Sequence, residues 1–183
     1  GEPVGVNEVR WQELQLPRVS QYWARIAQNV AAPQGGKTKW IYVADRESDV
    51  YDVFARLEEA GADCVVRACY ERKIAGEERT IFEAVKNAPL LGEVKIELRA
   101  RPGRAARIAV ASVRAAKAVL HAPKRPGEKL PPLAPLSIVE IAEEKTGAGE
   151  PLHWILLTTL PAETFEKALA AIAIYRQRWL IEE

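Results

Sequence analysis

The stretch WIYVADRESDVY, residues 40–51, joins an apolar strand to the start of a helix. The apolar run ends at Asp45, so we expect a strand that finishes on a carboxylate. Ser48 is a candidate N-cap, with Asp49 in the first helical turn, where the helix dipole favours negative charge. Ligands and metals usually bind at the carboxyl ends of strands in α/β sheets. Asp45 is therefore a candidate site residue, and a simple turn or cap residue is the alternative.

The elements around this stretch predict a parallel strand–helix–strand unit. The apolar positions of the expected helix recur at helical spacing and are Val50, Val53, Phe54 and Leu57. Gly61 is a candidate C-cap, and residues 64–69, CVVRAC, predict a second strand. This order with a short loop implies parallel strands and a right-handed crossover. A further amphipathic helix is expected at residues 19–30.

The composition is that of an ordinary soluble globular protein. The chain has 183 residues, of which 48% are hydrophobic and 28% charged. It contains no apolar run of membrane-spanning length, and its first residues do not resemble a signal peptide. With two cysteines and two histidines, a structural metal site built on those residue types is not expected. We expect Cys64 and Cys69 to be reduced and buried, as in a cytoplasmic protein.

Residues 74–150 have a different character from the segments on either side. Alternating apolar and polar residues predict strands at 94–98, 107–113 and 136–142, and a proline-rich loop fills 122–135. We expect a small antiparallel sheet inserted into an α/β domain. Residues 1–73 would form the first part of that domain, and residues 151–183 would form its last strand and helix.

Charge is distributed unevenly, although the net charge is only +1. Basic residues crowd into positions 99–129, where Glu128 is the only acidic residue. Such segregation can serve phosphate binding, and a solvated face is the alternative.

The last helix, expected from Pro161 to the end of the chain, carries three polar residues on one face. Tyr175, Arg178 and Glu182 follow one another at i, i+3 and i+7. A strand-end Asp and a helix Glu that meet can form half of a site for Mg²⁺ or Mn²⁺. The arginine and tyrosine can hold a phosphate beside such a site. An amphipathic helix with ordinary charge pairs is the alternative.

Four segments, taken in order, resemble the insertion-sequence-4 family of bacterial DDE transposases. The pattern Y-x2-R-x3-E at residues 175–182 resembles the family signature, and ADRESDVY around Asp45 resembles its DRE motif. VVRACYERK at residues 65–73 is similar to a stretch whose basic residues contact DNA. HWILLTT at residues 153–159 is similar to the strand before the signature helix. The resemblance covers about residues 40–183 and implies a ribonuclease-H-like α/β fold.

The resemblance also implies roles for eight residues. Asp45 and Glu182 would be catalytic carboxylates that bind Mg²⁺ or Mn²⁺. Trp154 would stack a flipped base, with a buried core position as the alternative. The residues expected to contact DNA are Tyr175, Arg178, Arg67, Trp154, Arg72 and Lys73.

The chain departs from the family pattern in two ways. No aspartate precedes Asp45, although the family's first catalytic aspartate lies on an earlier strand, and the signature's closing lysine would lie beyond residue 183. We therefore expect an internal transposase fragment that lacks the first strands of the fold and is inactive by itself. The parent enzyme would cleave transposon ends and transfer them to target DNA as a homodimer. The alternative is a non-catalytic DNA- or protein-binding module.

Overall fold

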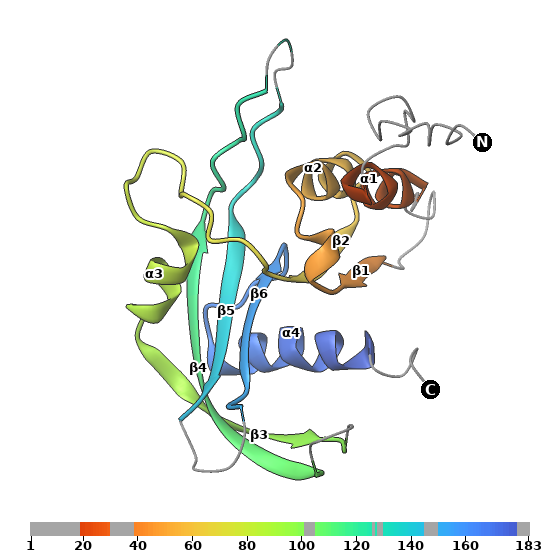
Figure 1. The fold of residues 1–183 in the computed structure, drawn as a ribbon. Helices are drawn as coiled ribbons and strands as arrows, with labels where there is room; N and C mark the ends of the chain where they lie inside the picture. Colours follow the sequence, from red (N-terminus) through yellow and green to blue (C-terminus); the bar gives the residue numbers. More distant parts are fainter. Residues whose placement is uncertain are drawn as a thin grey trace, which may run out of the picture.

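The computed structural model describes residues 19–29, 39–100, 105–125, 127, 130–144 and 150–178. These residues form a mixed α/β fold around one six-stranded, mostly antiparallel sheet (Figure 1). The strands are β1 (Ile41–Ala44), β2 (Asp63–Arg67), β3 (Leu90–Leu98), β4 (Arg107–Ala118), β5 (Leu136–Glu143) and β6 (His153–Thr158). The helices are α1 (Val19–Asn29), the short 3-10 helix η1 (Arg46–Ser48), α2 (Tyr51–Glu59), α3 (Ile81–Lys86) and α4 (Phe165–Gln177). None of the described helices is long and apolar enough to cross a membrane.

The strand order is β1-β2-β6-β5-β4-β3. β1 and β2 are parallel, which confirms the predicted strand–helix–strand unit, and every other neighbouring pair is antiparallel. The three strands expected in an insertion, β3 to β5, are antiparallel to one another. They do not form a sheet of their own, because β5 pairs with β6 and continues the sheet that holds β1 and β2. The expected separate sheet is therefore corrected to one continuous sheet.

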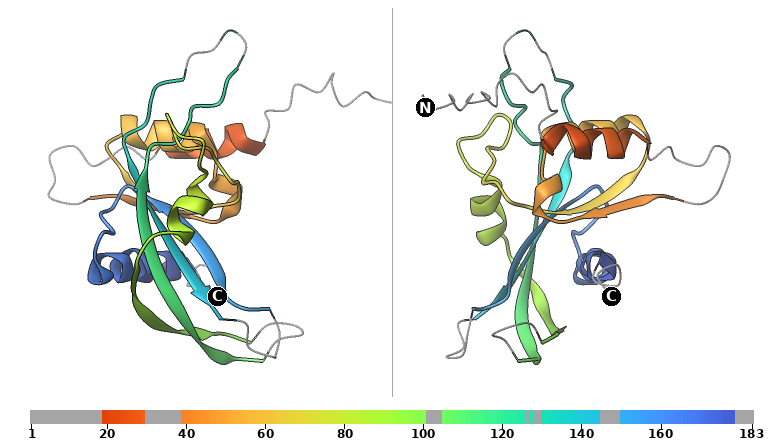
Figure 2. Two further views of the ribbon diagram at one scale, coloured as in Figure 1. Left: turned by 90° about the vertical axis from the view of Figure 1, so that its left-hand side faces the viewer. Right: turned by 45° about the vertical axis from the view of Figure 1, so that its right-hand side comes forward.

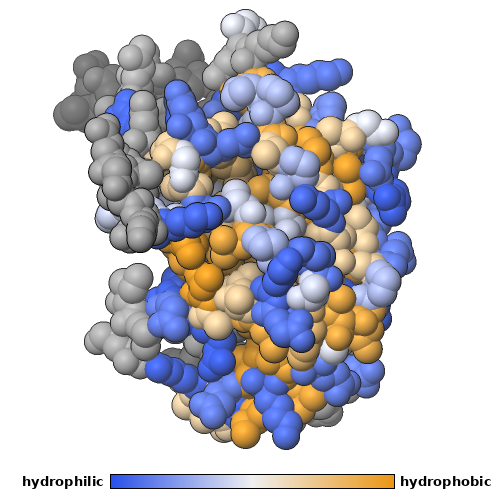
Figure 3. Space-filling view, turned by 180° about the vertical axis from the view of Figure 1, so that it is seen from behind, coloured by the Kyte–Doolittle hydropathy of each residue, from blue (hydrophilic) through white to orange (hydrophobic). Residues whose placement is uncertain are grey.

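Helices cover both faces of this sheet, and each face has its own core (Figure 2). Successive residues of a strand point to opposite faces. Cys64 and Val66 of β2 accordingly join the core under α1, α2 and α3, while Val65 joins the core under α4. In α4, Ala168 and Ile172 face the sheet, and Tyr175, expected on the polar face of that helix, is buried with them. The surface seen from behind Figure 1 mixes hydrophilic and hydrophobic areas (Figure 3).

Several local predictions need correction. Ser48 is not the N-cap of α2, because η1 intervenes and Val50 takes the cap position without a side-chain hydrogen bond. Ser48 is instead buried, and its hydroxyl lies 3.1 Å from the hydroxyl of Tyr42. The helix expected from Pro161 begins at Phe165, since the Thr164 side chain caps it by accepting from the Lys167 backbone N–H. Cys64 is buried as expected, but Cys69 is exposed.

The C-terminal end of α2 follows the sequence prediction, and α3 has a defined start. Gly61 directly follows the C-cap of α2 with a φ of 66°, the left-handed conformation that glycine adopts without steric cost. Helix α3 begins behind a capping box between Thr80 and Glu83.

Candidate active site

Asp45 directly follows the last residue of strand β1, Ala44. Its side chain accepts a hydrogen bond of 2.8 Å from the Arg46 backbone N–H and so caps η1. The carboxylate is 39% exposed, so capping leaves it accessible to other groups. The position matches the predicted strand-end carboxylate, and the alternative role as a cap applies at the same time.

Helix α4 brings two predicted residues to this carboxylate. The Tyr175 hydroxyl donates to Asp45 Oδ1 at 3.3 Å, and Arg178 Nη2 lies 3.3 Å from Asp45 Oδ2. Tyr175 and Arg178 are three residues apart and therefore project from neighbouring positions of one helix face. The Arg178 guanidinium also lies 6.0 Å from the centre of the Tyr175 ring. The helix face predicted to meet the strand end does so for these two residues.

The neighbouring strands β2 and β6 add an arginine and a tryptophan. Arg67 Nη1 lies 4.0 Å from Asp45 Oδ1, and Arg67 Nη2 donates to the His153 carbonyl oxygen at 3.2 Å. Trp154 is buried, and its ring meets that of Tyr175 edge-on with centroids 5.4 Å apart. Edge-on aromatic pairs are stabilising, so Trp154 supports the ring whose hydroxyl contacts Asp45.

These side chains line a cavity of about 480 Å³. Three arginines and two carboxylates contribute to its wall, so the charged groups leave an excess of positive charge. The residues that line it are Asp45, Arg46, Arg67, Leu98, Glu150, Pro151, Leu152, His153, Trp154, Tyr175 and Arg178. A small anion such as a phosphate fits both the volume and the charge.

The hydroxyl of Tyr175 is held in its neutral form at ordinary pH. Burial, followed by the negative charge of Asp45, raises the pKa of Tyr175 above its usual value of 10.0. The positive charges of Arg67 and Arg178 act in the opposite direction but do not reverse the shift. Tyr175 therefore offers the cavity a hydrogen-bond donor without a charge.

Two of the predicted residues that the structure describes, Arg72 and Lys73, stand apart from the cavity. Arg72 binds the buried carboxylate of Asp49 through Nε at 3.0 Å and Nη2 at 2.8 Å, and Lys73 pairs with Glu78 at 3.3 Å. Neither of them lines the cavity. Glu182 lies outside the described residues. The structure thus brings together Asp45, Arg67, Trp154, Tyr175 and Arg178.

Sequence reasoning missed Arg46, Glu150 and His153 as cavity residues. Arg46 is next to Asp45 in the quoted motif, and His153 begins the strand that carries Trp154, so their neighbours in sequence were the available signal. His153 Nε2 lies 3.0 Å from Glu140 Oε1, which anchors the ring at the cavity wall. Glu150 has no comparable motif around it.

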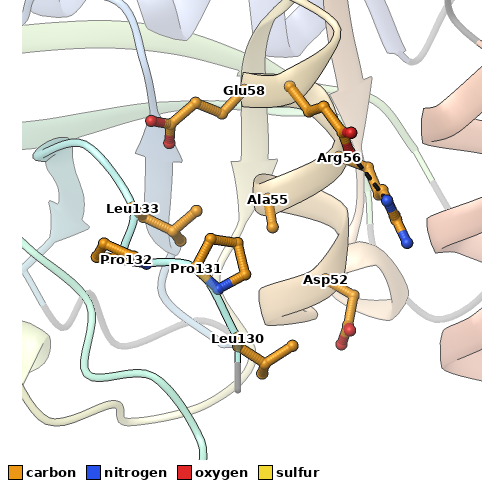
Figure 4. Close-up of a pocket in the computed structure, with 9 residues that line it drawn as sticks. Asp52, Ala55, Arg56, Glu58, Leu130, Pro131, Pro132 and Leu133 are labelled. Atoms are coloured by element: carbon orange, nitrogen blue, oxygen red, sulfur yellow. Dashed lines mark hydrogen bonds and ion pairs between the residues drawn. The ribbon is translucent and has the colours of Figure 1, made fainter. Parts of the chain in front are cut away.

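A larger cavity of about 540 Å³ lies between α2 and the proline-rich segment (Figure 4). Its polar groups already have partners within the chain. Glu58 accepts from the Ala134 backbone N–H at 3.0 Å, Arg56 pairs with Glu59, and Asp52 pairs with Arg125. None of the seven predicted site residues that the structure describes lines this cavity. The smaller cavity is therefore the better candidate, because charged groups from separate elements converge there.

The described residues alone do not fit a divalent cation. No group of three or more Asp, Glu, His or Cys residues within the described ranges is placed to hold a metal ion. Both carboxylate oxygens of Asp45 face cationic or donor groups, whereas Mg²⁺ needs several oxygen ligands at short distance. The predicted partner Glu182 would have to supply a second carboxylate.

No protein-family model matches the chain. The transposase resemblance therefore stays a prediction, and the site around Asp45 is described from the structure alone.

Proposed function

We propose that this chain is part of the catalytic domain of a ribonuclease-H-like transposase, and that the cavity beside Asp45 receives a phosphate of the DNA backbone. The observation that carries this proposal is the meeting of Asp45, Arg67, Trp154, Tyr175 and Arg178 around one cavity. These residues lie in four segments of the sequence, in or next to β1, β2, β6 and α4. Four separate segments of the sequence therefore contribute side chains to one cavity.

The chemistry of the cavity suits a phosphodiester. Arg67 and Arg178 present guanidinium groups that can bind phosphate oxygens in pairs, and Tyr175 adds a neutral donor. Both arginines also contact Asp45, which keeps their charge next to the carboxylate. The arginines thus offset the repulsion that a phosphate would meet from Asp45.

In the parent enzyme the same site would serve DNA cleavage at transposon ends and strand transfer to a target. A divalent cation would supply Lewis-acid chemistry for such a reaction. Since the described residues do not hold one, Mg²⁺ or Mn²⁺ enters the proposal only with Glu182. We expect this chain alone to be inactive, and end-specific nicking by it in the presence of Mn²⁺ would contradict that expectation.

Phosphate binding is tested by titrating DNA with this chain in EDTA. Fluorescence anisotropy measures the binding at several salt concentrations. Arg178→Ala and Arg67→Ala should each weaken binding several-fold. Each should also reduce the slope of log K against log salt concentration by about 1, the value for one lost phosphate contact. The matched control is Arg79→Ala, because Arg79 is exposed and pairs with Glu77 away from the cavity. If the cavity variants bind DNA as the control does, the proposed phosphate site is wrong.

One observation favours a second candidate function. Asp45 is engaged by Arg178 and Tyr175 and lacks a described carboxylate cluster around it, which suits a non-catalytic DNA- or protein-binding module. In that case the basic segment at residues 99–129 would supply the binding charge. DNA binding that survives the cavity variants but fails after charge reversal in that segment would support this alternative.

A further inference from the structure

Strand β3 forms one edge of the sheet (Figure 1). Within the described ranges, β4 is the only strand paired with it, so the outer backbone groups of β3 have no strand partner there. Glu93, Lys95 and Glu97 are exposed on one face, while Ile96 and Leu98 are buried against the α4 side. An edge strand of this kind can extend its sheet with a further strand.

The strand is held in place for such pairing. A register shift between Leu90 and Gly92 interrupts the ladder with β4 near its start, and regular pairing continues to Leu98. At Gly92 the Phe165 ring from α4 packs so closely that an added Cβ would lie 2.8 Å from it. The regular pairing of β3 with β4 therefore begins at Gly92, where Phe165 of α4 packs against β3.

Residues 93–99, EVKIELR, comprise the regularly paired part of β3 after Gly92 and the next residue, Arg99, and are complementary to themselves. Charges alternate in sign through Glu93, Lys95, Glu97 and Arg99. When a second β3 lies antiparallel with Ile96 opposite Ile96, Lys95 faces Glu97 and Glu93 faces Arg99 in both directions. On the other face Val94 meets Leu98. Opposite charges and apolar pairs placed directly across two strands are stabilising.

Neighbouring registers lose this match. Centring the pair on Lys95 or on Glu97 puts like charges opposite each other, which destabilises a strand pair. Edge strands often carry charges that prevent pairing with the edge strand of another molecule. Here the signs alternate, so the register centred on Ile96 places the most opposite charges across the pair. The exposed Ile108 and Val110 of β4 lie beside the edge, opposite Glu97 and Lys95, and add apolar surface next to it.

We propose that two copies of this chain associate through β3, antiparallel and centred on Ile96, so that the two sheets become one across a two-fold axis. The association needs no DNA and does not rest on the proposed function. A symmetric pair of this kind is isologous, since each contact occurs twice.

The test is sedimentation velocity of the chain without DNA, over a concentration series up to about 1 mM, the range in which weak specific pairs are detected. The native chain should show a concentration-dependent dimer. Lys95→Glu and Glu97→Lys each place like charges across the interface and should weaken the dimer at least about tenfold. An equimolar mixture of these two variants restores opposite charges at every central pair and should form a heterodimer.

The matched control is Lys117→Glu, which makes the same charge change on β4, where Lys117 is exposed and pairs with Ser137 inside the sheet. It should dimerise like the native chain. All three positions are exposed, so circular dichroism and thermal unfolding should be unchanged. A native chain that stays monomeric throughout the series, or a variant mixture that forms no heterodimer, would overturn the proposal.

Discussion

Asp45 and Asp49 lie on the same short segment and both face arginines, yet their surroundings differ. The Asp49 side chain is fully buried, and it accepts hydrogen bonds from the backbone N–H groups of Cys69 and Tyr70 at 2.7 and 2.9 Å. Arg72 donates two further hydrogen bonds to the Asp49 carboxylate, from Nε and Nη2. The Asp45 side chain is 39% exposed, and its arginine contacts measure 3.3 and 4.0 Å.

The difference separates a structural carboxylate from an available one. The Asp49 side chain accepts hydrogen bonds from three residues of the loop after β2, so it ties that loop to the segment before α2. Its contacts are short and shielded from water, and replacing any of them would cost much free energy. Asp45 has longer contacts at the wall of a cavity, where a ligand can compete for its arginines. The same residue type therefore serves stability at one position and binding at the other.

The largest expected effect comes from removing the buried carboxylate. Asp49→Ala leaves the Arg72 guanidinium and two backbone N–H groups without their acceptor in a buried place. Loss of one partner from a buried charged network costs about 3–5 kcal/mol of the free energy of unfolding. Urea unfolding followed by circular dichroism measures it. A loss below about 1 kcal/mol, the value for surface pairs, would show that Asp49 is not structural.

Double-mutant cycles compare the two arginine pairs directly. The cycle for Asp49 and Arg72 should give a coupling of about 1.5–3 kcal/mol, the range for hydrogen bonds to charged groups. The cycle for Asp45 and Arg178 should give about 0–1 kcal/mol, because the carboxylate is partly exposed and screened. Equal couplings in urea unfolding would remove the distinction between the two sites.

Much of the candidate site could be predicted because its residues follow local rules. An apolar run that stops at Asp45 marks a strand end, and the spacing of Tyr175 and Arg178 marks one helix face. The parallel pairing of β1 and β2 also follows from a strand, a helix and a strand joined by short loops. These features depend on residues close together in the sequence.

The features that sequence missed depend on contacts between distant segments. Asp49 looks like a first-turn residue of a helix, and only the packing of the loop after β2 makes it a buried acceptor. Arg72 likewise sits in a basic run that resembles a DNA-contacting stretch, while its side chain points to Asp49. The continuation of the sheet through β5 depends on its register with β6, which no short pattern encodes.

A third aspartate, Asp52 in the first turn of α2, lies between the two extremes and supplies a pH test. The hydrogen bond from Arg125 lowers the pKa of Asp52 below its ordinary value of 3.8. A carboxyl whose pKa is lowered by folding stabilises the native state above its unfolded pKa, and this contribution is lost as pH falls through the folded pKa. Asp52→Asn should cost about 1 kcal/mol at pH 7, and the difference from the native chain should shrink below about pH 4. Urea unfolding at each pH measures it, and a difference that does not change with pH would contradict the assignment.

The smallest effect on stability is expected at the candidate site itself. Asp45→Asn keeps an oxygen that can accept from the Arg46 backbone N–H, and it removes only long, partly exposed charge contacts. The free energy of unfolding should therefore change within about 0.5 kcal/mol, whereas the matched Asp49→Asn should lose several times more. The same Asp45→Asn change makes the cavity more positive, so affinity for DNA in EDTA should rise. A large loss of stability together with unchanged DNA affinity would make Asp45 a second structural carboxylate and would leave the cavity without a binding role.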